Sequence, residues 1–340
     1  MLLFIDGFDH YAAGDIAKKW TSILGSTTKS SNLGRRGGGA LKFTSNSDVV
    51  SKAFTASETV VVGFAIYFEA LGSGAPFISF YYSATGQMSL FVTPSGSIAA
   101  YSGIYSFNTK FGESASGVFS EDSWYYVEIK TKFHGSAGTI EVRVNGSATP
   151  VLNVSGKNTA PSGNNQSNSV RLIGVSSGLG FQYVDDLYIL ETGSSPNDDF
   201  LGDCRVDTLM PNADGYYGNW QANSSPSLHY QLLDESSPNT SDYIESSTAS
   251  NKDSWSFDNL TAVTGSIFGA AINLASFKSD AGDRSIKPLC RSGSTDSLGS
   301  AFTLSTDQLY AQKIYEVDPN TSSAWAEANV NSAEFGVECE

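Results

Sequence analysis

The chain has 340 residues, of which 20 are basic and 35 acidic, giving a formal net charge of −15. Such a chain repels phosphates and anionic lipid, which argues against direct nucleic-acid binding. The sequence contains no apolar run of 18 residues, so we expect no membrane insertion. Only 16% of residues are charged while 12% are aromatic, and turn and β-branched residues are abundant. This composition predicts an all-β protein, and the length favours two domains.

The three cysteines are Cys204, Cys290 and Cys339, an odd number with no Cys-x-x-Cys pair. We therefore expect free thiols, and neither a disulfide framework nor a zinc site. The first residues contain no basic region, and an acidic residue, Asp6, follows after only five positions. We therefore expect that the chain is made in a cytoplasm and has no signal peptide.

Segments typical of strands recur between turn signals over the first 190 residues. They cover residues 40–44, 60–68, 77–82, 88–93, 124–131, 139–144, 170–175 and 181–190. The run 60–68 fits a strand buried on both faces, and Asn145-Gly146 predicts a tight hairpin turn. We expect Trp124 to be buried between two sheets, because this spacing of short strands is typical of a sandwich or jelly roll.

A polar run at residues 191–198, rich in Gly, Ser, Pro and Asn, predicts a linker between domains at 1–190 and 199–340. The charge also divides there, at −2 for residues 1–198 and −13 for residues 199–340. After the linker, strands are expected at 228–233, 267–277 and 309–317, so the second domain is predicted to be β-rich.

Several segments together resemble tailed-bacteriophage virion proteins that carry a concanavalin-A-like (laminin-G-like) jelly roll. In the first half these segments are 5–11, Lys19-Trp20, 34–41, 123–128, 140–146 and 183–188. In the second half they are 200–206, 210–215, Trp220, 280–284, Asp318-Pro319, Trp325 and 335–337. The likeness rests on the order and spacing of these motifs across nearly the whole chain.

This resemblance implies a concanavalin-A-like jelly-roll sandwich followed by a second β-rich domain for virion assembly or attachment. It implies a structural or accessory component of a virion, in the tail, fibre, neck or capsid decoration. Such a component is non-enzymatic and acts through interfaces with other virion proteins or with its own copies. The expected location is the virion, and the expected state is a homo-oligomer.

Glycoside hydrolases also use this fold, and they need two carboxylates across the scissile bond, for example as Glu-x-Asp-x-(x)-Glu on one strand. Nothing in the chain matches, so we expect no enzyme and no cofactor. Asp185 and Asp186 are weak candidates for binding calcium. Because they are adjacent, we expect them to point to opposite faces of a strand, one toward solvent and the other toward a loop amide.

The alternative function is a lectin-like module that recognises a glycan of the host surface. Candidate aromatic residues for stacking on sugars lie in the loop 100–110, at Tyr101, Tyr105 and Phe107. The same residues could serve a protein interface. In the second domain Tyr216, Tyr217 and Trp220, with Trp255 and Trp325, predict an aromatic interface patch. The basic segment Arg35-Arg36 before three glycines predicts a solvent-exposed loop.

Overall fold

The computed structural model describes residues 1–72, 75–105, 108–175, 180–193, 196–225, 228–261 and 263–340. The chain divides into two compact units, the first made of Met1–Asp9 and Ala13–Val206 and the second of His10–Ala12 and Asp207–Glu340. The first unit therefore includes residues 199–206, which lie beyond the linker expected at 191–198. Among the described residues no helix is long and apolar enough to cross a membrane.

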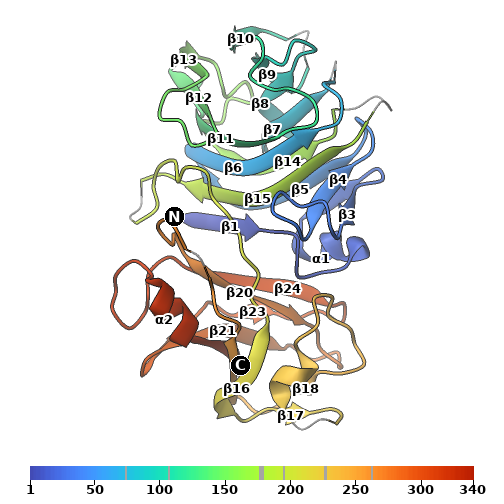
Figure 1. The fold of residues 1–340 in the computed structure, drawn as a ribbon, viewed down its shortest axis with the longest axis vertical. Coiled ribbons are helices and arrows are strands. Elements are labelled where there is room, and N and C mark those ends of the chain that lie inside the picture. The colour runs from blue at the N-terminus through green and yellow to red at the C-terminus, as the bar shows by residue number, and fades with distance from the viewer. Residues whose placement is uncertain (73–74, 106–107, 176–179, 194–195, 226–227, 262) are drawn as a thin grey trace. The chain divides into compact units, whose positions relative to one another are not determined.

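The first unit contains two antiparallel sheets (Figure 1). One has eight strands in the order β13-β12-β11-β6-β15-β4-β3, with β1 added on β15. The bounds of its strands are β1 Leu2–Asp6, β3 Thr28–Ser30, β4 Ala40–Phe43, β6 Thr59–Phe68, β11 Trp124–Lys132, β12 Gly138–Val144, β13 Leu152–Lys157 and β15 Gln182–Glu191.

The other sheet has seven strands in the order β10-β9-β8-β7-β14-β5-β2. Their bounds are β2 Ser22–Leu24, β5 Val49–Ser57, β7 Pro76–Tyr82, β8 Thr85–Val92, β9 Ile98–Ser102, β10 Lys110–Glu113 and β14 Ser167–Ile173. A short 3-10 turn, η1 (Ala13–Asp15), leads into α1 (Ile16–Lys19) near the start of the chain.

The core of the first unit lies between these sheets and is filled by the side chains that alternate inward along the strands. Phe64 and Phe68 of β6 are fully buried and contact Phe77 of β7 with ring centroids 6.4 and 6.5 Å apart. Thr131 of β11 reaches the sulfur of Met88 of β8. The unit is an all-β jelly-roll sandwich, as predicted, and β6 is buried along nearly its whole length.

The hairpin between β12 and β13 begins at the predicted turn. Asn145 and Gly146 both have positive φ, at 53° and 68°, and the Ser147 amide donates to the carbonyl of Val144. Positive φ at both central residues is the conformation that Asn-Gly favours. This prediction is confirmed.

The second unit is also β-rich. Its main sheet has the order β16-β19-β25-β21-β22, with β23 on β21, and β17–β18 and β20–β24 form separate pairs. The bounds are β16 Pro211–Gly218, β17 Gln221–Ala222, β18 Ile244–Glu245, β19 Lys252–Phe257, β20 Ala270–Ser276, β21 Ser285–Ser292, β22 Thr295–Leu298, β23 Phe302–Thr303, β24 Leu309–Tyr315, β25 Glu334–Cys339 and α2 Glu327–Ser332.

Two expectations for this unit are wrong. The segment 228–233 forms a 3-10 helix, η2 (His229–Leu232), because Asp214 accepts the Tyr230 amide and the Gln231 and Leu233 amides bond three residues back. Trp255 and Trp325 are each 4% exposed and belong to the hydrophobic core, so they cannot form an interface patch.

Candidate functional site

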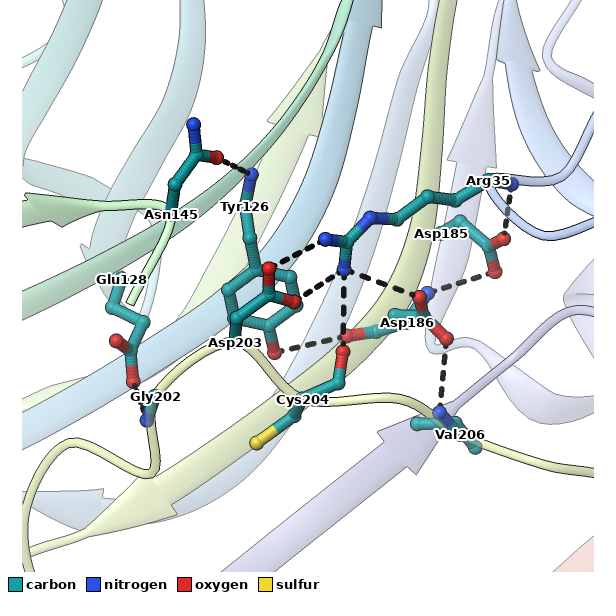
Figure 2. A network of polar contacts seen from close by, with 10 residues as sticks. All are labelled: Arg35, Tyr126, Glu128, Asn145, Asp185, Asp186, Gly202, Asp203, Cys204 and Val206. Carbon is teal, nitrogen blue, oxygen red and sulfur yellow. Dashed lines mark hydrogen bonds and ion pairs between the residues drawn. The ribbon is translucent and has the colours of Figure 1, made fainter. Parts of the chain in front are cut away.

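The outer face of the eight-stranded sheet carries a polar network that holds the segment 199–206, here called the strap (Figure 2). Glu128 of β11 is buried, and its Oε1 accepts the hydroxyl of Tyr188 at 2.6 Å. The same oxygen accepts the amides of Leu201 and Gly202 at 2.9 and 2.8 Å. Three donors thus converge on one oxygen of Glu128. The strap is thus fixed to β11 and β15.

Arg35 forms the second anchor of the strap. Its two terminal nitrogens bond both oxygens of Asp203, and its guanidinium lies 5.3 Å from the ring centroid of the buried Tyr126. Hydrogen bonds and charges from Asp203 hold the pKa of Arg35 above its ordinary value against the opposing effect of burial. The predicted solvent loop is therefore wrong for Arg35, while the neighbouring Arg36 is exposed.

Asp185 and Asp186 both lie buried beside Arg35, so the expectation of opposite faces is wrong. The register of β15 on β6 passes from Asp185–Ala65 directly to Tyr188–Gly63, so two residues of β15 oppose one of β6. Asp186 takes up this bulge with a φ of 51°. A bulge interrupts the alternation of side chains, which brings the second carboxylate toward the first.

Three of the four oxygens of this pair accept hydrogen bonds from backbone amides, and the fourth, Oδ2 of Asp186, lies 3.7 Å from the guanidinium of Arg35. Asp185 accepts the amides of Arg35 and Asp186 at 2.8 Å each, and Asp186 accepts the amide of Val206 at 2.9 Å. Burial, and then the charge of Asp186, raise the pKa of Asp185. A calcium ion would have to displace these donors, and the described residues contain no group of three His, Cys, Asp or Glu side chains placed to hold a metal.

The outer face of the seven-stranded sheet is built differently. Its register places one row of side chains across six strands, in the order Tyr101, Ser89, Ser79, Arg171, Ser51 and Ser22. Val170 and Leu172, on either side of Arg171, are fully buried, so this row faces away from the core. We call this surface the serine face.

A depression of about 260 Å³ lies on the serine face. Its lining is small and polar, and consists of Thr21, Ser22, Ser51, Ala53, Ser83, Asn168, Ser169 and Arg171. The guanidinium of Arg171 stacks on Tyr81 at 3.6 Å from the ring centroid. None of the described residues of this lining is a carboxylate.

Two of the predicted aromatic residues lie at this surface. Tyr101 belongs to the row itself and packs edge-on against Phe91, with ring centroids 5.1 Å apart. Tyr105 is 53% exposed and lies close enough to Tyr81 to help raise its pKa, a rise caused first by burial. Phe107 lies outside the described residues. Tyr101 thus lies on the serine face three strands away from Arg171. The depression itself is lined by Arg171, which the sequence did not single out, and by neither tyrosine.

Trp124 lies on the outer face of the eight-stranded sheet and is only partly buried, so its predicted place between the sheets is wrong. Its ring lies 5.6 Å from that of Tyr67, which lies 5.8 Å from Tyr183. Tyr67 and Tyr183 bond Asp122 and Glu69. Because side chains alternate along β11, it is Tyr125 and not Trp124 that points toward the core, where it contacts the ring of Phe119.

In the second unit the predicted aromatic residues have separate environments. Tyr216 is 68% exposed beneath the guanidinium of Arg291, 4.0 Å from its ring centroid. Tyr217 donates to Asp296 at 2.5 Å. Trp220 packs against the hydrophobic core and donates to the carbonyl of Asn251. Tyr216 is thus the one of these three that presents most of its side chain to solvent.

Comparison with known proteins yields similarity in structure alone. No family model matches the chain, and no curated protein matches it. A glycosyl hydrolase family protein from Mycobacterium fortuitum is 13% identical with a TM-score of 0.36, covering 56% of this chain and 100% of that one. Domain 4 of the extracellular arabinanase AbnA from Geobacillus stearothermophilus, in complex with arabinotriose, is 15% identical with a TM-score of 0.33, covering 49% and 76%. The Caenorhabditis elegans galectin LEC-6 is 12% identical with a TM-score of 0.30, covering 44% and 96%.

Proposed function

We propose that this protein binds a glycan through the serine face of its jelly roll and does not hydrolyse it. The observation that carries the proposal is the depression lined by Ser22, Ser51, Ser169, Asn168 and Arg171. Hydroxyl and amide groups both donate and accept hydrogen bonds, which matches the many hydroxyls of a sugar. The volume of about 260 Å³ is slightly below that of drug-sized ligand sites and suits one or two sugar residues.

The surroundings of the depression support the same ligand class. A sugar ring has an apolar face as well as hydroxyls, and an exposed tyrosine offers both an apolar ring and a polar hydroxyl. Tyr105, beside Tyr81, supplies such a ring.

The absence of hydrolysis is proposed from the lining. Glycosidases of the common kind place two carboxyl groups on either side of the scissile bond. The described lining of the depression holds none. Glu128, a buried carboxylate of the other sheet, is occupied by Tyr188 and the strap amides.

A glycan array probed with the full chain tests this function. Tyr105→Ala and Ser22→Trp, which fills the depression from its exposed rim, are expected to lower binding at least tenfold. Phe181→Ala is the matched control, because Phe181 is also an exposed aromatic residue (37%) but lies on the other sheet, over Lys42. Loss of binding in the control alone, or release of reducing sugar by the wild type, contradicts the proposal.

We also propose that the module acts in the virion of a tailed bacteriophage, where it joins other virion proteins or its own copies. The order of the sequence motifs supports this location, and the exposed Tyr216 with Arg291 supplies a contact surface in the second unit. Cross-linking of purified particles is expected to join residues near Tyr216 to a neighbouring subunit. Absence of the protein from particles excludes the location and leaves glycan binding untouched.

A further inference from the structure

The charges around the serine face indicate which class of glycan it would bind. Arg171 is part of the depression, yet no ion pair joins it to any carboxylate of the described chain, although acidic residues outnumber basic ones by 35 to 20. By contrast Arg35, Arg143, Arg284 and Arg291 each pair with an Asp or Glu at 2.5–2.7 Å. Arg171 is therefore a cation without a compensating anion.

The hydrogen bonding around Arg171 is also incomplete. Its Nε is buried with no hydrogen-bond partner among the described residues, and the same holds for Oγ of Ser79, its register partner on β7. A buried polar group left unpaired costs stability, and such groups are uncommon in folded proteins. Arg171 and Ser79 are register partners, and each carries one such unpaired group. The fold therefore tolerates the loss of stability at this position.

The orientation of Arg171 is set by Tyr81. A ring centroid 3.6 Å from the guanidinium carbon places one face of the guanidinium against the aromatic ring. A ligand can then meet the guanidinium only at its edges or its other face. The edge of a guanidinium presents two parallel N–H groups that match the two oxygens of a carboxylate.

We propose that the glycan bound by the serine face carries a carboxylate, as in a uronic-acid or sialic-acid residue, and that Arg171 binds this carboxylate. This inference rests on the proposed glycan-binding function. The hydroxyls of Ser22, Ser51 and Ser169 would then bond the neighbouring sugar hydroxyls. The overall charge of −15 disfavours anions elsewhere, so selectivity for an acidic sugar is local to Arg171.

The test uses two ligands that differ only in charge: galacturonic-acid oligomers and the same oligomers as methyl esters. The array is also screened for other acidic glycans, including sialylated and sulfated ones. We expect tighter binding of a carboxylate glycan than of its ester, by about 10- to 100-fold, since a hydrogen bond to a charged group contributes about 1.5–3 kcal/mol. The preference should shrink as salt is raised.

Variants of Arg171 separate the charge from its geometry. Arg171→Gln should abolish the preference for acid over ester, while Arg171→Lys keeps the charge, loses the paired N–H groups and should retain only part of the preference. Arg36→Gln is the control, because it removes one positive charge from an exposed position on another loop. Thermal unfolding of each variant confirms that it folds.

The outcomes separate the two proposals. Equal binding of acid and ester, or a preference for sulfated glycans only, overturns the carboxylate inference and leaves glycan binding intact. A preference that survives in Arg171→Gln also overturns it. Silence toward every glycan on the array overturns the proposed function and the inference together.

Discussion

Arg35 and Asp203 form a two-pronged ion pair across 168 residues of sequence, with nitrogen–oxygen distances of 2.5 and 2.6 Å. Their side chains are 14% and 32% exposed. The pair joins the loop before β4 to the strap, and Asp186 lies 3.7 Å from the same guanidinium. One arginine therefore compensates two carboxylates that belong to different segments of the first unit.

Removal of Arg35 is expected to destabilise the first unit. Arg35→Ala should lower its free energy of unfolding by about 2–4 kcal/mol, because Asp186 would remain buried without its cation. Arg35→Lys should cost about half as much, because an ammonium cannot bond both oxygens in the same geometry. Urea unfolding measures both. Arg36→Ala is the control and should change stability by less than about 0.5 kcal/mol; equal effects at both positions would refute the anchor role.

Gly63 of β6 is expected to tolerate no side chain. A Cβ at this position would lie 2.1 Å from Cε1 of Tyr188, whose hydroxyl donates to Glu128. Gly63→Ala should therefore lower the free energy of unfolding by about 2–3 kcal/mol. In a Tyr188→Ala background the same substitution should cost little, since the clashing ring is gone. Additive losses in the double variant would show that Tyr188 is not the cause.

Lys52 is expected to make stability depend on pH. Burial, followed by the charge of Lys19, lowers the pKa of Lys52 from 10.5 to about 8, although Asp6 opposes this. Between pH 8 and 10.5 the unfolded chain holds this proton more tightly than the native chain, so the free energy of unfolding rises with pH. The rise attributable to Lys52 is roughly 3 kcal/mol, since its pKa falls from 10.5 to about 8, and below pH 8 it is absent.

Lys52→Met should remove that dependence. Urea unfolding at pH 7.0, 8.0 and 9.5 should show a rising midpoint for the wild type and a flatter profile for the variant. Lys157→Met, on the edge strand β13, serves as the control and should keep the wild-type slope. An unchanged slope in Lys52→Met would assign the dependence to other groups.

The thiols are expected to be unreactive in the native protein. Cys204, Cys290 and Cys339 are free, and burial raises the pKa of Cys204 and Cys290 to about 12. Because the thiolate is the reactive form, native protein at pH 8 should react with Ellman's reagent far more slowly than unfolded protein. Unfolded, non-reduced protein should release three equivalents. Fewer than three would reveal a disulfide.

Most strands of the first unit could be predicted because alternation and turn residues are local signals. Residues 124–131 and 139–144 fall within β11 and β12, and Asn145-Gly146 follows β12 as the turn. The expectation that side chains alternate between the two faces of a strand failed where an extra residue forms a β-bulge. The bulge at Asp186 places adjacent carboxylates together, and no alternation pattern indicates where such a bulge occurs.

The candidate site could be predicted only in part. An exposed loop with aromatic residues pointed to Tyr101 and Tyr105, but Arg171 stands in a strand with ordinary neighbours in sequence. The role proposed for Arg171 rests on Ser79, Ser51 and Tyr81, which other strands bring to it. Which residues become register partners across a sheet depends on the topology, and topology is a long-range property.

The motifs behind the resemblance to virion proteins have structural roles in the first unit. Asp6 bonds Trp20 and the buried Lys19, and Arg35 and Asp186 hold the strap. The proposed ligand site lies outside these motifs, because none of them includes Ser79 or Arg171.

The strap also determines how the first unit responds to mechanical force. A pull on the chain beyond Val206 acts first on the amide of Val206 held by Asp186, then on Asp203 held by Arg35, and then on Gly202 and Leu201 held by Glu128. Between these bonds and the end of β15, Asp199 is held by Lys130 and the carbonyl of Asn197 accepts the amino group of Met1. Tension reaches β15, the strand that pairs with β1, β4 and β6, only after these contacts also break. The sandwich is therefore shielded from shear on the chain that leaves it.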